Sequence, residues 1–188
     1  MSKREGEDMS EQPKPVSFPY NAQKAAQVIL WLLHKHGGRM DRLKLVKLVF
    51  LADREHLLKF GRPIVGGEYW NMPLGPLSSE LLDHVKGGLN DVPMPFDVAS
   101  PCHIETRAAV DEDELSESDM DILTETNKKY GNYSSLRLSH MTHQMSLWKD
   151  NAPGRGGRNP LPYENFFLGC EDQDMLDIIR DHQAALGF

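Results

Sequence analysis

This sequence has few cysteines, no long apolar run and no apolar segment at its start. Its 188 residues include two cysteines, Cys102 and Cys170, which are too few for a disulfide framework. Two isolated thiols are typical of a reducing compartment, so we expect a cytoplasmic protein. No apolar run approaches the roughly 18 residues of a membrane span. Residues 1–12 are polar, which indicates no signal peptide. These absences argue against a membrane protein and a small secreted scaffold.

Positive charge is scarce as well. Lys and Arg number 21 against 28 Asp and Glu, so the formal net charge is −7, which argues against a basic nucleic-acid coat protein. The imbalance is local: residues 35–62 hold eight bases and three acids (+5), whereas residues 111–125 hold eight acids and no base (−8). The acidic segment is interpreted either as a solvated face or as an edge that docks a basic partner. The acids expected on this edge are Asp111, Glu112, Asp113, Glu114, Glu117, Asp119 and Asp121.

Motifs of catalysis and metal binding are also missing. There is no Gly-x-x-x-x-Gly-Lys loop, no Gly-x-Gly-x-x-Gly turn and no Gly-x-Ser-x-Gly elbow. The Gly-rich segment 154–158 follows no expected strand, which favours a mobile loop over a phosphate cradle. His140 and His143 could share a helix face, but no third and fourth ligand follow at the spacing of a zinc cage. The sequence therefore predicts a protein that is not an enzyme and that uses no cofactor or metal.

Helical periodicity dominates the chain. Apolar residues recur at three- and four-residue steps from Tyr20 to His36, after Asn21 as a potential cap. From Asp41 to Phe60 apolar side chains go nearly all the way round, which is typical of a helix buried on most sides. Further helices are expected over residues 79–86, 116–130, 134–148 and 171–186, with a short one near 162–168.

Two or three short strands should lie between these helices. Residues 68–72 and 102–110 alternate well enough for strands, while 90–101 is expected to be a loop. Gly75-Pro76 should break the first strand and open the next helix. The fold class predicted is α+β, mostly α: about six or seven helices around a central apolar helix, with a small antiparallel sheet. Residues 1–16 are expected to be a disordered polar tail and 17–188 a single domain.

An ordered set of motifs is more specific than any of these patterns. Residues 45–56 read LVKLVFLADREH and are followed by FGRPI at 60–64, GGEY at 66–69 and LGPL at 74–77. The second half adds Leu115-Ser116, Tyr130-Gly131, Ser134 to Leu138, Thr142-His143, Trp148 and LPY at 161–163. In this order, from about Tyr20 to Leu168, the chain resembles the SocA-like family of Panacea antitoxin domains.

The resemblance implies a prokaryotic or phage antitoxin that neutralises a co-encoded toxin by direct binding. One lineage of the family instead delivers its toxin to a AAA+ protease, so a proteolytic adaptor is an alternative. A nucleic-acid-binding regulator is less favoured, because the helix after Gly37-Gly38 is too apolar to serve as a recognition helix. The expected partner is the cognate toxin; a protease, a homo-oligomer and a toxin–antitoxin hetero-oligomer stay open.

The resemblance also singles out individual residues, which we expect to hold the fold first and to contact a toxin only secondarily. These family-motif residues are Lys47, Asp53, Tyr69, Gly75, Pro76, His143 and Trp148. Lys47 and Asp53 could pair with neighbours across the buried helix. Trp148 is expected to pack in the core with its indole N–H bonded.

Overall fold

The computed structural model describes residues 14–88, 94–170 and 174–186. Within these ranges seven α-helices and two three-stranded antiparallel sheets give the expected α+β, mostly helical fold. Most of the expected polar tail, residues 1–13, lies outside the described residues. Val16, at the end of that expected tail, is buried, and its backbone N–H donates to Glu164 Oε1 at 2.8 Å.

Two helices form the centre of the domain: α1 (Ala22–Lys35) and α2 (Arg42–Phe60). Both begin where their caps predict, because the side chains of Asn21 and Asp41 accept backbone N–H groups of the first turn. Gly61 ends α2 in the left-handed conformation, with φ of 72°. Every residue from 45 to 53 is buried, which explains why the apolar pattern of α2 goes round the helix.

The strands are more numerous than expected and form two sheets. One sheet has the order β1 (Arg39–Asp41), β5 (His103–Glu105), β4 (Asp97–Ser100), and the other β3 (Gly75–Ser78), β2 (Tyr69–Met72), β6 (Asn159–Pro160). The strand expected over 102–110 is thus shorter, and β4 lies in the segment expected to be a loop. The first strand ends at Met72, before Gly75, but the expectation that Gly75-Pro76 opens a helix was wrong, since both belong to β3 and face Met72 and Asn71 across the hairpin. Proline is tolerated there because β3 is an edge strand.

Helices occupy much of the remaining chain. α3 (Ser79–His84) starts after Ser78, and α4 (Glu117–Tyr130) starts with the expected Ser116–Asp119 capping box. The single helix expected over 134–148 is two, α5 (Ser135–His143) and α6 (Ser146–Lys149), because Met145 is extended with ψ of 141°. The short elements η1 (Glu112–Glu114) and η2 (Tyr163–Phe167) and the last helix, α7 (Asp174–Ala185), complete the described chain.

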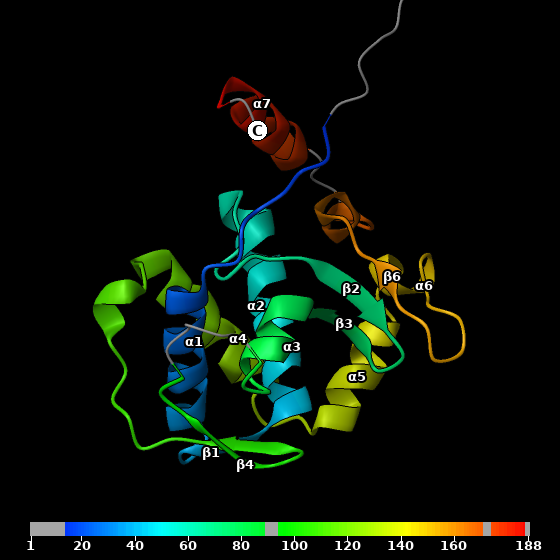
Figure 1. Cartoon of the computed structure of the whole chain (residues 1–188). Coiled ribbons are helices and arrows are strands. Elements are labelled where there is room, and N and C mark those ends of the chain that lie inside the picture. Colours follow the sequence, from blue (N-terminus) through cyan, green and yellow to red (C-terminus); the bar gives the residue numbers. More distant parts are fainter. Residues whose placement is uncertain (1–13, 89–93, 171–173, 187–188) are drawn as a thin grey trace, which may run out of the picture.

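Helix α2 runs through the middle of the molecule (Figure 1). It packs against α1 and α4 on one side and against the β2–β3 hairpin and α5 on the other. The helix α7 lies at one end, where Gln183 exchanges two hydrogen bonds with the backbone of Ser17. Across the described ranges, none of the helices combines the length and the apolar character that crossing a bilayer requires.

Candidate partner-binding surfaces

Side chains from three helices hold the turn of the β2–β3 hairpin. The bonds run from Lys47 Nζ on α2 to Pro76 O (2.6 Å), from Ser139 Oγ on α5 to Leu74 O (2.8 Å) and from Trp148 Nε1 on α6 to Met72 O (3.2 Å). Each bond satisfies a carbonyl of the hairpin with a donor that is itself buried or half-buried. The turn is therefore fixed on the side that faces the protein interior, and its outer side faces solvent.

Close packing around Gly75 explains why this position has no side chain. Its φ is 95°, and a Cβ atom there would lie 2.5 Å from Thr142 Oγ1 and 2.9 Å from Lys47 Nζ. His143 stacks on Trp148 with 3.9 Å between ring centroids. Burial, and then the positive charges of Lys47 and His140, lowers the pKa of His143. Five of the seven family-motif residues thus meet at this turn.

Lys47 is fully buried, and no carboxylate of the described residues forms an ion pair with it. Among the described residues, the Lys47 ammonium donates one hydrogen bond, to the Pro76 carbonyl. Burial in an apolar helix holds the pKa of Lys47 well below that of a free lysine. Lys47 therefore pairs across the buried helix, as the sequence suggested, but with a carbonyl dipole.

The other two family-motif residues, Asp53 and Tyr69, bind each other at the opposite end of β2. Asp53 is fully buried and accepts the Tyr69 hydroxyl at 2.6 Å. It also accepts three consecutive backbone N–H groups, those of Ile64, Val65 and Gly66, each at 3.0 Å. Burial raises the pKa of Asp53 to about 6, although these hydrogen bonds act in the opposite direction. This carboxylate sets the course of the loop that leads from α2 to the sheet.

Asp119 has to be removed from the acidic edge expected from the sequence, because its side chain is fully buried. It lies 2.7 Å from Lys24 Nζ, 3.0 Å from Arg62 Nη1 and 3.1 Å from His56 Nε2. Burial by itself would raise the pKa of Asp119, but hydrogen bonds from His56, Lys24 and Ser116 outweigh it and hold this pKa far below its usual range. Sequence reasoning found only the capping box here. It missed the three basic partners, which come from α1, α2 and the segment after α2.

The six other acids remain at the surface around η1 and the start of α4. Glu114 is half-buried and accepts Gln23 Nε2 at 2.8 Å, and the rest are exposed. We call this set the acidic edge: Asp111, Glu112, Asp113, Glu114, Glu117 and Asp121. Among the large hydrophobic side chains exposed in the described chain, none lies between residues 111 and 125. The acidic edge therefore offers charge without an apolar centre.

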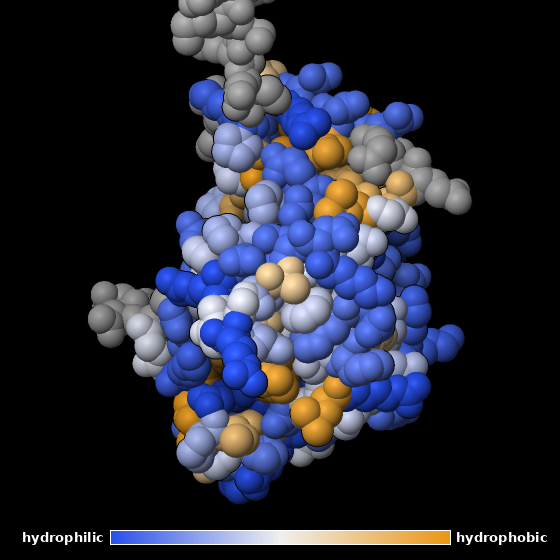
Figure 2. Space-filling model, turned by 90° about the vertical axis from the view of Figure 1, so that its right-hand side faces the viewer, coloured by the Kyte–Doolittle hydropathy of each residue, from blue (hydrophilic) through white to orange (hydrophobic). Residues whose placement is uncertain are grey.

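A second surface combines exposed apolar side chains with positive charge. Leu74 at the hairpin turn is 50% exposed and Leu136 on α5 is 70% exposed. Basic side chains belong to the same and neighbouring elements, since Arg137 follows Leu136 on α5, Lys149 lies on α6 and Arg158 lies in the loop before β6. We call the set of Leu74, Leu136, Arg137, Lys149 and Arg158 the α5–hairpin face. Figure 2 shows the side of the molecule where α5, α6 and β6 lie, with separate apolar patches on a largely hydrophilic surface.

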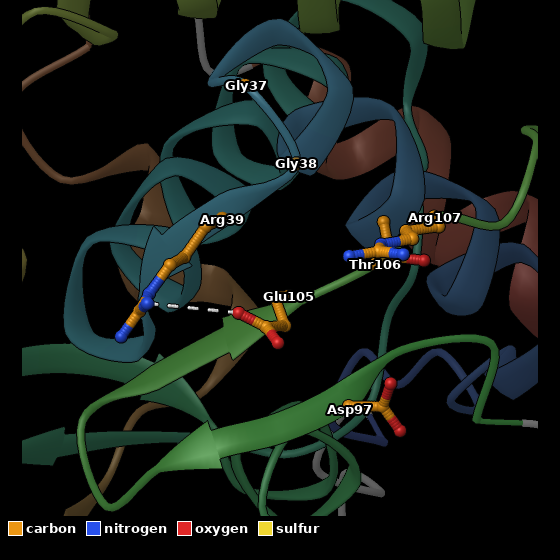
Figure 3. A pocket seen from close by; sticks show the side chains of 7 residues that line it. All are labelled: Gly37, Gly38, Arg39, Asp97, Glu105, Thr106 and Arg107. Carbon is orange, nitrogen blue, oxygen red and sulfur yellow. Dashed lines mark ion pairs between the residues drawn. The ribbon is translucent and has the colours of Figure 1, made fainter.

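A hollow of about 680 Å³ opens beside the β1–β5–β4 sheet (Figure 3). Its charged lining is balanced: Arg39 points toward Glu105, with 3.9 Å between Nη1 and Oε2, while Arg107 and Asp97 lie on other sides of the hollow. Both partners of the ion pair are about half exposed, so the pair contributes little. No sequence motif pointed to this hollow, and its self-neutralised rim favours no particular ligand.

The remaining candidates of the sequence gather into no common site within the described residues. His140 is exposed, whereas His143 is stacked on Trp148. Cys102 is exposed in the β4–β5 turn, and Cys170 lies 3.4 Å from Arg54 Nη2. In the part of the chain that the structure describes, no three His, Cys, Asp or Glu side chains gather in a way that could hold a metal ion.

A comparison with protein families adds one finding. The model of the family described as antitoxin SocA-like, Panacea domain, matches residues 45–149, from α2 to α6. No curated protein and no solved structure matches the chain. The matched span contains both the clamped hairpin turn and the acidic edge.

Proposed function

The chain belongs to the SocA-like antitoxin family of Panacea domains, and we propose that it neutralises a co-encoded toxin by binding it directly. The family match over residues 45–149 carries this proposal. The chain acts by occupying a surface of the toxin, and no catalytic step is needed. The cytoplasm is the compartment in which we expect the pair to meet.

The buried motif residues support this function indirectly. Lys47, Asp53 and Tyr69 have almost no exposed surface, so they cannot themselves touch a partner without unfolding. They fix the hairpin and the loop before it, and the toxin must contact what those elements present. Toxin contacts are therefore sought among the exposed residues around this frame.

Co-expression with the neighbouring reading frame tests the function. The small protein encoded beside this chain should stop growth when expressed alone, and this chain should restore growth and co-purify with it. Failure of both rescue and co-purification would overturn the antitoxin assignment.

Toxin half-life separates masking from the adaptor alternative. If the chain masks its toxin, rescue persists in a protease-deficient strain and the toxin accumulates in the complex. Rescue that disappears together with the AAA+ protease would instead identify an adaptor. A salt-dependent shift of duplex DNA by the isolated chain would favour the regulator alternative.

The acidic edge is proposed to steer a basic surface of the toxin. Glu112→Lys combined with Asp121→Lys reverses two exposed acids whose side chains form no cap or ion pair within the described residues. The association rate should fall by about tenfold at low salt, because opposite charges accelerate encounter. The control reverses Asp177 and Asp181, two exposed acids of α7, of which Asp177 forms an exposed ion pair with Arg180 (3.4 Å) that contributes little. Equal association rates for both double variants would eliminate the acidic edge.

A further inference from the structure

The two exposed leucines of the α5–hairpin face lie on elements that a direct hydrogen bond connects. Ser139 Oγ on α5 donates to Leu74 O at 2.8 Å, and Leu136 precedes Ser139 by one helical turn. Large exposed apolar side chains on two elements in direct contact are candidates for a binding site. The neighbouring Trp148 and Met72 are half-buried and extend the apolar surface at the same turn.

The chain segment that supplies α5, α6 and the loop before β6 is mostly basic. Residues 127–160 contain six bases, namely Lys128, Lys129, Arg137, Lys149, Arg155 and Arg158, against the single acid Asp150, which gives +5 in a chain of net −7. Arg137 lies over the Tyr133 ring at 3.7 Å and Arg158 over the Trp70 ring at 4.4 Å. Within the described residues, Arg137, Lys149, Arg155 and Arg158 form no ion pair with a carboxylate. Their charges are available to acids of another molecule.

The α5–hairpin face is also rigid at the hairpin turn, which favours binding. The carbonyls of Met72 and Leu74 are bound by Trp148 and Ser139, and Gly75 is packed against Thr142. A side chain mounted on such a turn loses little conformational freedom when a partner covers it. Aromatic and arginine side chains next to a rigid apolar centre are the composition of interface hot spots.

From these observations we infer that the α5–hairpin face holds the toxin, by docking an apolar patch of the toxin that is ringed by carboxylates. This inference rests on the proposed antitoxin function. It assigns the two surfaces of the chain different tasks. The acidic edge governs the rate of encounter, whereas the α5–hairpin face, with its apolar centre, governs how long the complex lasts.

Binding kinetics of the full chain with the co-encoded toxin test this division. The variant Leu74→Glu with Leu136→Glu should dissociate about 30-fold faster or more, since both leucines would be hot-spot contacts. Leu74→Met with Leu136→Met keeps an apolar surface and should bind within about threefold of the wild type. Arg137→Glu with Arg158→Glu should weaken binding and repel the carboxylate rim. The matched control is Ile178→Glu on α7, where Ile178 is 60% exposed, and it should leave the kinetics unchanged.

Each outcome has one reading, provided that circular dichroism shows the variants folded. Wild-type dissociation rates in both the Glu and the Arg variants would overturn the α5–hairpin face while leaving the antitoxin function intact. A wild-type chain that does not bind the toxin at all would overturn the proposed function and this inference with it. Two outcomes with unchanged toxin affinity would assign the face to a different occupant and overturn the inference. One is self-association of the chain that the Leu→Glu variant abolishes. The other is binding of a single-stranded oligonucleotide that the Arg variant abolishes.

Discussion

Two carboxylates, Asp53 on α2 and Asp119 on α4, are fully buried in opposite surroundings. Asp53 is bound by three backbone N–H groups and the Tyr69 hydroxyl, all of them neutral donors. Asp119 is bound by Lys24, Arg62 and His56. The difference shows in their acidity, since the pKa of Asp53 is raised to about 6 and that of Asp119 is lowered.

The comparison teaches how one residue type can serve two structural purposes. Dipoles that point at Asp53 shape the loop 64–66 without supplying a compensating charge, so burial still opposes ionisation. The cations around Asp119 supply that charge and come from different segments, so this carboxylate joins α1, α2 and α4. Asp119 should therefore matter more to global stability than Asp53 does at neutral pH.

Replacing Asp119 by asparagine is the largest expected effect. The amide removes the negative charge that faces Lys24 and Arg62, and breaking an ion pair with a buried partner typically costs about 3–5 kcal/mol of unfolding free energy. Asp121→Asn, which changes the same charge at an exposed site two residues further along α4, should cost less than about 0.5 kcal/mol. Urea unfolding at pH 7 measures both. Equal midpoints for the two variants would contradict the role given to Asp119.

The pH dependence of the two carboxylates should have opposite signs. Between pH 3.8, the usual pKa, and about 6, the folded chain keeps the proton on Asp53 while the unfolded chain has lost it. Rising pH therefore removes stability, by about 3 kcal/mol over this window, and no more is lost above it. For Asp119 the folded pKa is the lower one, so its stabilisation is complete above pH 3.8 and is lost as the pH falls further.

Unfolding of the wild type and of both Asn variants, measured from about pH 2 to 7, separates these two contributions. The unfolding free energy of the wild type, relative to that of Asp53→Asn, should fall as the pH rises from 4 to 6. The difference between wild type and Asp119→Asn should stay constant down to about pH 4, near the usual carboxyl pKa, and should then close. Parallel curves for the two variants would show that the surroundings of Asp53 and Asp119 do not differ as described.

At neutral pH, Asp53→Asn should have a moderate effect. The amide oxygen can still accept the N–H groups of Ile64 and Val65, but the amide nitrogen replaces the oxygen that accepts Gly66 N–H and the Tyr69 hydroxyl. A buried donor left unsatisfied costs about 1–3 kcal/mol, and relief of the buried charge offsets part of this cost, so the net loss should be smaller than that for Asp119→Asn. Glu55→Gln on the same helix, where Glu55 is 45% exposed, is the control and should cost under about 1 kcal/mol. A larger loss for Asp53→Asn than for Asp119→Asn would reverse the comparison.

How much the sequence predicts depends on how local the cause is. The caps Asn21 and Asp41 and the end at Gly61 were predictable, because a helix boundary depends on a few neighbouring residues. The same holds for the capping box of Ser116 and Asp119. That Asp119 is buried was not predictable, since its partner Lys24 is 95 residues away in the chain.

The errors at the hairpin have the same origin. Glycine and proline at 75–76 read locally as a breaker, whereas they form an edge strand because β2 pairs with them and Lys47 binds the Pro76 carbonyl. Likewise, nothing local breaks the helix expected over 134–148. The seven family-motif residues were found through the resemblance, and only the fold shows that they gather at the two ends of β2.

Lys47 extends the comparison to a third buried charge and gives the smallest expected effect. It has one carbonyl acceptor and no carboxylate, so the free energy lost on removing its hydrogen bond is offset by relief of a buried ammonium. Lys47→Met should therefore change the unfolding free energy at pH 7 by no more than about 1 kcal/mol. Because burial lowers the folded pKa of Lys47, the unfolded chain binds the proton more tightly. The wild type should then gain stability over Lys47→Met as the pH rises toward 10. Lys59→Met, at an exposed lysine of the same helix, should show no such trend. A Lys47→Met chain that fails to fold would instead mean that the ammonium bond to Pro76 is indispensable to the hairpin turn, and with it to the α5–hairpin face.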